Sequence, residues 1–111
     1  MAYDQDFANR IREELADVDG ITEKAMFGGL GFLLHGNMAV GIASTGELMV
    51  RVGPDGTDDA IKRPHTRQFE MRGRAMTGWI LVAPEGLRTK RQLGPWVRRG
   101  TALAASLPPK G

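Results

Sequence analysis

The sequence contains no cysteine among its 111 residues. Disulfide bonds and metal sites built on cysteine are therefore excluded. Two histidines are present, His35 and His65, and neither has a second imidazole or a carboxylate at a metal-ligand spacing. We therefore expect two exposed, unpaired histidines, no bound metal and no other cofactor.

Long apolar segments are missing as well. No run approaches the ~20 residues that a helix needs to cross a bilayer. The N-terminus, MAYDQDFANR, has neither the basic start nor the apolar stretch of a signal peptide. We expect a soluble, cytoplasmic protein that does not act at a membrane. A chain of 111 residues fits one domain, residues 1–111, with a core of its own.

Catalytic signatures are also absent. Ser44 and Ser106 do not lie in the context of a nucleophile elbow. The glycine cluster at 28–31 has neither the Gly-Lys-Ser/Thr of a P-loop nor the glycine spacing of a dinucleotide site, and it indicates a bulge or a close backbone approach. We expect no catalytic residues and no enzyme activity. The alternative is an enzyme whose site is assembled from scattered residues.

Charge is present but unevenly distributed. Residues 1–61 hold four basic and eleven acidic residues, whereas residues 62–111 hold eleven basic and two acidic ones. Such asymmetry is typical of a surface for nucleic acid or an acidic partner. Alternatively, the two halves fold against each other and partly neutralise. Because arginine suits phosphate geometry, the candidate polyanion-binding residues are Arg63, Arg67, Arg72, Arg74, Arg88, Arg91, Arg98 and Arg99.

Apolar periodicity predicts three helices. In residues 4–17, Phe7, Ile11 and Leu15 recur every four positions, which indicates an amphipathic helix. A short helix is predicted for residues 57–62, and a longer one for residues 89–107.

The last helix has a clear start and an uncertain middle. Thr89 and Gln92 have the spacing of a capping box. Gly94-Pro95 interrupts the pattern, so the helix is either kinked at Pro95 or begins afresh there. We expect it to pack on the sheet through Val97 and Leu103.

Alternating apolar residues and glycine turns predict five strands. Gly36-Asn37 is the hairpin signal between the first two. The expected fold is α+β with two layers: a five-stranded antiparallel sheet with helices on one face, in the order α-β-β-β-α-β-β-α. The predicted strands are 22–34 (broken or bulged at the glycine cluster), 38–42, 48–52, 69–71 and 79–82.

Trp79 and Trp96 are the two largest apolar side chains. Each is either a core residue or part of a partly exposed interaction surface. Methionine and aromatic side chains favour adaptable contacts. The candidate partner-binding residues are Lys24, Met26, Phe27, Arg51, Met76 and Trp79.

Several segments carry a resemblance to a known family. They are KAMFGGLGF at 24–32, NMA at 37–39, LMVRVG at 48–53, GRAMTGW at 73–79, WV at 96–97 and SLPPK at 106–110. With these segments the sequence resembles the TfoX N-terminal domain family, named for the competence regulator TfoX. The resemblance implies a two-layer α/β fold. Gly94-Pro95 departs from the family pattern.

The resemblance also implies a function class. The full-length regulator acts in transcriptional control and has a second, C-terminal domain. This chain ends where that domain would begin, so we expect a stand-alone domain and do not carry the regulator's activity over whole. The leading hypothesis is a non-catalytic regulatory module with a protein partner, linked to transcription. The alternative is weak nucleic-acid binding through the basic C-terminal half. Oligomeric state stays open.

Overall fold

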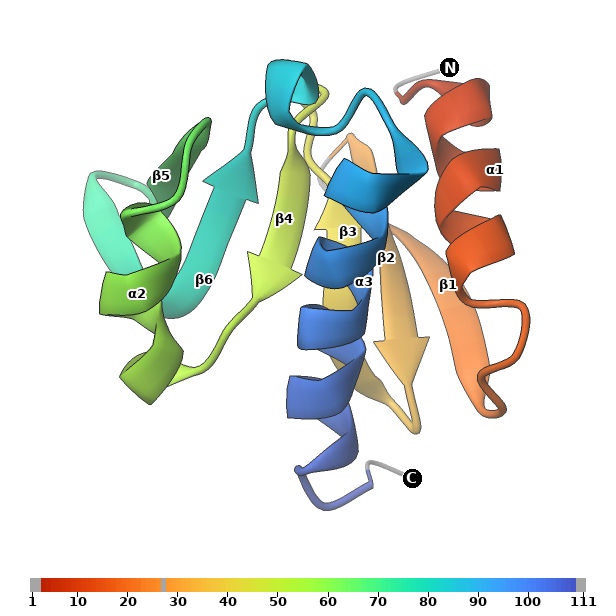
Figure 1. Ribbon diagram of the computed structural model, residues 1–111. Coiled ribbons are helices and arrows are strands. Elements are labelled where there is room, and N and C mark those ends of the chain that lie inside the picture. The colour runs from red at the N-terminus through yellow and green to blue at the C-terminus, as the bar shows by residue number, and fades with distance from the viewer. Residues whose placement is uncertain (1–2, 27, 110–111) are drawn as a thin grey trace.

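The computed structural model describes residues 3–26 and 28–109. Four consecutive strands separate α1 from α2, and two strands separate α2 from α3 (Figure 1). In chain order they are α1 (Gln5–Glu14), β1 (Ile21–Met26), β2 (Gly29–Leu34), β3 (Asn37–Ile42), β4 (Leu48–Arg51), the 3₁₀ turn η1 (Pro54–Gly56), α2 (Thr57–Ile61), β5 (Thr66–Met71), β6 (Arg74–Val82), the 3₁₀ turn η2 (Pro84–Gly86) and α3 (Lys90–Ala105).

The described strands form one antiparallel sheet of six, in the order β1-β2-β3-β4-β6-β5. The prediction of five strands is wrong because segment 22–34 is a hairpin rather than one bulged strand. β1 ends at Met26 and β2 begins at Gly29, which pairs with it. The connection includes Gly28 with φ 77°, a left-handed conformation that glycine adopts without strain. It carries no polar turn residue, so the pattern reads as continuous.

The second hairpin turns one residue earlier than predicted. Leu34 pairs with Asn37, so the turn residues are His35 and Gly36, with φ 50° and 84°. Positive φ at both central residues is the type I′ geometry that matches the twist of hairpin strands. The Gly36-Asn37 signal is therefore shifted, and His35 takes a left-handed conformation that Asn usually occupies.

One face of the sheet carries the core and all the described helices, which confirms the predicted two-layer arrangement. In Figure 1, α1, α2 and α3 lie on the same side of the strands. The buried cluster joins helix residues Phe7, Ile11, Leu15, Leu93 and Val97 to strand residues Leu30, Phe32, Val40, Ile42, Leu48, Val50, Ile80 and Val82. Leu103 is only half-buried, contrary to prediction, and lies against Gly53.

Side chains cap the N-termini of α1 and α3, and all three helices end earlier than predicted, at Glu14, Ile61 and Ala105. The Asp4 carboxylate accepts hydrogen bonds from the backbone N–H of Asp6 at 2.8 Å and of Phe7 at 3.5 Å. Thr89 and Gln92 form the reciprocal capping box. α3 runs through Pro95 as one helix, so it does not restart there. In the described part of the chain, no helix has the length and hydropathy of a membrane span.

Thr57 joins the start of α2 to an irregular stretch of β6. Its buried hydroxyl donates to the Gly53 carbonyl at 2.9 Å and accepts from the Gly78 N–H at 2.9 Å. The β5–β6 register shifts between Gln68 and Glu70, and Gly78 has φ 94°. Trp79 alternates with the core residue Ile80, so it lies on the face away from the helices.

Candidate interaction surface

The sheet face opposite the helices carries a groove of about 470 Å³. Strand register explains its floor. Gly31 pairs with Gly41, and both alternate with core residues that point to the helices. Because neither glycine has a side chain, no side chain fills the centre of this face at these two positions, and the surface is recessed there. The groove therefore follows from glycine at two facing strand positions.

Methionine side chains cover this floor. A Cβ at Gly31 would lie 2.5 Å from the Met38 methyl and 3.0 Å from the Met26 methyl. A Cβ at Gly41 would lie 3.4 Å from the Met49 methyl. Met71 and Met76 line the outer end, so all five methionines in the described residues border one groove. Thioether side chains are flexible and polarizable, which suits a surface that adapts to a partner.

Two aromatic side chains complete the wall. Phe69 and Trp79 line the groove from β5 and β6, and both are half-buried. The Arg51 guanidinium lies over the Trp79 ring, 5.2 Å from its centroid, and its Nη1 donates to the Met38 carbonyl at 3.5 Å. The cation–π contact holds a positive charge beside an apolar surface. Trp79 is thus a wall of the groove rather than a core residue.

The charges around the groove are mostly positive. Lys24 lies on the same face as Gly31, Arg51 covers Trp79, and Arg72 lines the outer end. None of these three has a carboxylate partner in the part of the chain that the structure describes. Glu70 is the acidic residue among the described lining residues. An apolar groove beside unpaired cations favours a ligand that is both apolar and acidic.

The predicted partner-binding residues come together here. Met26, Met76 and Trp79 line the groove, and Lys24 and Arg51 lie beside it. Phe27 lies outside the described residues. Binding by this set stays a prediction, but its members share one surface.

Five of the eight candidate polyanion-binding arginines line three different hollows. Arg72 borders the groove, Arg88 lines a separate hollow near the start of α1, and Arg63, Arg91 and Arg99 line a third cavity between α2 and α3. Others are partly neutralised by acidic residues. Arg67 pairs with Glu47 at 2.6 Å, and Arg63 and Arg99 share Asp59.

Acids of the first half neutralise part of the basic second half. Lys90 on α3 pairs with Glu13 on α1 at 3.6 Å, and Arg67 pairs with Glu47. Each ion pair joins residues on opposite sides of position 61. This agrees with the alternative that the two halves fold against each other.

Two ion pairs shift glutamate pKa values. The hydrogen bond from Arg67 lowers the pKa of Glu47. Burial of the carboxyl group acts in the opposite direction, and the hydrogen bond from the Thr45 hydroxyl lowers the pKa further. The hydrogen bond from Arg12 likewise lowers the pKa of Glu23. Their arginine partners therefore favour the charged form of both carboxylates.

Other sequence signals stay separate in space. His35 and His65 are both exposed, at the β2–β3 turn and in the α2–β5 loop. Across residues 3–26 and 28–109, no group of three or more His, Cys, Asp or Glu side chains is placed to hold a metal ion.

Comparison with known proteins adds the family. The family model for the TfoX N-terminal domain matches residues 13–104, which includes every strand and nearly all of α3. The chain belongs to the TfoX N-terminal domain family. A search of curated proteins gave no match.

Sequence reasoning missed part of the groove of this TfoX N-terminal domain. Met38, Met49, Phe69 and Met71 line it but were not among the predicted residues. A signal was available: Met49 alternates with the core residues Leu48 and Val50, so it had to point to the opposite face. Met38 could not be placed this way, because a bulge between Phe32 and Leu33 changes the register.

Proposed function

We propose that this TfoX N-terminal domain is a non-catalytic regulatory module that binds an acidic, amphipathic helix of a partner protein in the methionine groove. The observation that carries the proposal is the gathering of five methionines, Phe69 and Trp79 around one groove beside unpaired cations. Met71 and Met76 are 38% and 36% exposed, unusual values for large apolar side chains in this chain.

The shape of the surface supports a helix as the occupant. A groove in an open sheet face accepts the apolar stripe of a helix, as the opposite face of this sheet accepts α1 and α3. Its volume of about 470 Å³ accommodates several apolar side chains. Methionine walls allow the groove to fit the residues that enter it.

The charges support an acidic partner. Lys24, Arg51 and Arg72 have no carboxylate partner in the described residues. Carboxylates along the sides of a docked helix would pair with them. Complementary charge at the rim speeds association and selects among partners more than it raises affinity.

Transcriptional control is the setting that we propose for this contact. The regulator for which the family is named acts there, and a module without catalytic residues acts by contact. Direct nucleic-acid binding has less support, because five of the eight candidate arginines are divided among three hollows and Arg63, Arg67 and Arg99 have acidic partners.

The experiment uses photo-methionine incorporated in cells in place of methionine. Because the described methionines all border the groove, ultraviolet irradiation should cross-link the occupant of the groove selectively. We expect a protein adduct of discrete mass that survives nuclease treatment. The peptide of the partner protein that is cross-linked to the groove should be rich in acidic and apolar residues.

Two charge variants with matched exposure provide the control. Met76→Glu places an acid in the groove, whereas Ile61→Glu changes a side chain of similar exposure, 38%, outside it. We expect Met76→Glu to remove most of the adduct and Ile61→Glu to leave it unchanged. Adducts formed only at Met1, adducts lost with nuclease, or equal adducts in both variants would contradict the proposal.

A further inference from the structure

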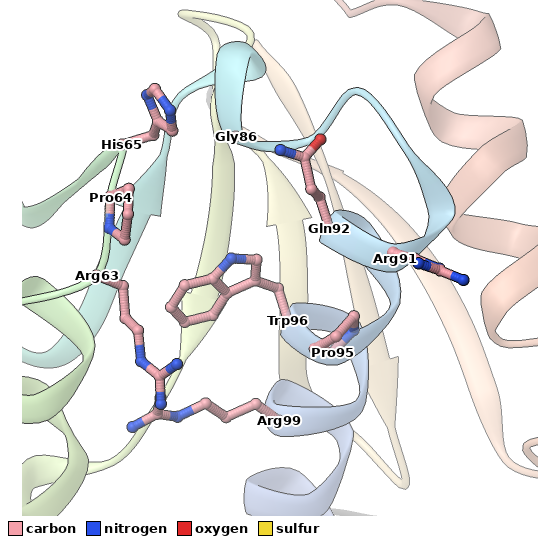
Figure 2. A pocket seen from close by; sticks show the side chains of 9 residues that line it. All are labelled: Arg63, Pro64, His65, Gly86, Arg91, Gln92, Pro95, Trp96 and Arg99. Carbon is pink, nitrogen blue, oxygen red and sulfur yellow. The ribbon is translucent and has the colours of Figure 1, made fainter.

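A second cavity lies on the opposite side of the sheet, between α2 and α3. Its volume is about 420 Å³. Figure 2 shows the Trp96 indole in the middle of the residues that line it, with Arg63 and Arg99 on one side and His65 and Gln92 on the other. The sequence does not predict that these residues come together, and the proposed function does not use this cavity.

Gln92 directs a hydrogen-bond donor into this cavity. Its Oε1 accepts the backbone N–H of Thr89 at 3.1 Å in the capping box. Because the amide oxygen accepts this hydrogen bond, the NH₂ group of the same amide is available to donate to a ligand. In Figure 2 that nitrogen is on the side of the cavity. The cap thus fixes the orientation of Gln92 and presents Nε2 to whatever occupies the cavity.

Two guanidinium groups lie along the lower side. Arg99 donates to the Gly56 carbonyl at 3.1 Å and to the Asp59 carboxylate at 3.3 Å, so its position is set by the protein. Arg63 reaches the same carboxylate only at 3.8 Å, with 59% of its side chain exposed. One carboxylate therefore faces two guanidinium groups, and a positive charge remains.

Trp96 adds a planar surface and a further donor. The indole is half-buried against the core, and the Arg99 guanidinium lies 5.7 Å from its centroid. Its Nε1–H has no hydrogen-bond acceptor among the described residues. A half-buried ring beside arginines is a place where a planar base can stack.

The loop that closes the cavity is fixed by its own contacts. His65 has φ 65°, and its carbonyl accepts the Ala83 N–H at 2.8 Å. Gly86 lies so near that a Cβ there would be 2.9 Å from the His65 Cβ. Glycine at 86 therefore permits this close approach of η2 to the loop.

From these contacts we infer that the cavity between α2 and α3 binds a small phosphate-bearing ligand with a planar ring, the chemistry of a mononucleotide. The phosphate accepts from Arg63, Arg99 and Gln92 Nε2, and the ring stacks at Trp96. The side chains that converge there are donors, which matches the acceptor oxygens of phosphate. The cavity lies in the size range of small-molecule sites.

The test is a titration followed by the indole N–H resonances of ¹⁵N-labelled protein. The chain has two tryptophans, so the Trp79 signal, which Trp79→Phe would assign by its loss, is an internal control. The probes are ADP and inorganic pyrophosphate. We expect both to shift the Trp96 resonance and not the Trp79 resonance. ADP should bind about tenfold more tightly, because a stacked base adds to the phosphate contacts.

Gln92→Glu is the most informative variant. Glutamate at this position preserves the capping box, since Glu serves there as well as Gln. It also replaces the donor by a carboxylate that repels phosphate. We expect an unchanged melting temperature and affinity for ADP reduced by about tenfold or more. Arg63→Gln should weaken ADP binding several-fold, whereas Arg74→Gln, with the same loss of charge on the β5–β6 hairpin, should not.

Three results would overturn the inference. They are no shift of Trp96 at millimolar ADP or pyrophosphate, equal affinity for the two probes, and unchanged binding in Gln92→Glu. The first two contradict the site and the ring contact respectively, and the third contradicts the role of Gln92. None of them bears on the methionine groove, which lies on the other face of the sheet.

Discussion

Glu47 is the side chain that ties the turn before β4 to the edge strand β5. Its carboxylate receives Arg67 Nε at 3.0 Å and Nη2 at 2.6 Å, a two-point contact, and also the Thr45 hydroxyl at 2.8 Å. Only 13% of the Glu47 side chain is exposed, against 57% for Arg67. The pair therefore joins the turn before β4 to β5 at the surface, with the carboxylate of Glu47 largely covered.

This pair predicts a pH dependence of stability. Because the folded pKa of Glu47 is lowered, its contribution is fully present above the usual glutamate value of 4.5 and is lost as pH falls through the lower folded value. Urea denaturation between about pH 6 and about pH 3 should show the free energy of unfolding decreasing. In Glu47→Gln the decrease should be smaller. An identical pH profile for the two proteins would contradict this account of the pair.

Contacts between residues close in sequence were predictable, whereas contacts between distant residues were not. Asp4, Thr89 and Gln92 were predictable as caps because their partners are three or fewer residues away. Thr57 was not predictable as a link to β6, since the Gly78 N–H is 21 residues away. Contacts that depend on distant pairing need the fold to be known first.

At the scale of elements, α3 rests on β3 through a glycine. A Cβ at Gly100 would collide with the Ala39 carbonyl and would lie 2.6 Å from Val40 Cγ1. The helix backbone therefore approaches the strand more closely than any larger residue permits. This contact places α3 over the centre of the sheet and fixes which helix residues reach the core.

We predict that Gly100→Ala destabilises the protein although alanine is the better helix former. Overpacking at this contact should cost about 1–3 kcal/mol of unfolding free energy. The reverse change at an exposed position of the same helix, Ala102→Gly, should cost about 1 kcal/mol through propensity alone. Urea denaturation measures both. A Gly100→Ala protein more stable than the wild type would show that the close approach does not exist.

The elements divide into those with local signals and those without. The helices and the two-layer arrangement followed from periodicity and caps. The sixth strand did not, because the connection between β1 and β2 carries no polar turn residue to separate the two strands. The sequence also left open whether α3 continues through Pro95. In the structure Leu93 and Val97, on either side of Pro95, both pack in the core, and the helix is continuous.

At the scale of the whole molecule, the sheet separates two surfaces of different character. Helices cover one face, and the cavity beside Trp96 lies there among arginines. The other face is open and holds the methionine groove. The sequence showed an excess of positive charge in its second half, but strand pairing distributes that charge over both faces. Composition left open whether this charge forms one basic surface or is partly neutralised by the first half, and ion pairs such as Arg67–Glu47 and Lys90–Glu13 agree with partial neutralisation.

The central claim, that the open face binds an acidic amphipathic helix, is tested most directly by methyl spectra of protein labelled with ¹³C at the methionine methyl groups. Two synthetic helical peptides with the same leucine stripe serve as probes, one flanked by glutamate and one by lysine. We predict that the glutamate peptide shifts the resonances of Met38, Met49 and Met76 together, with less effect in Arg51→Gln, and that the lysine peptide does not. Equal shifts with both peptides, or none with the glutamate peptide, would contradict the claim.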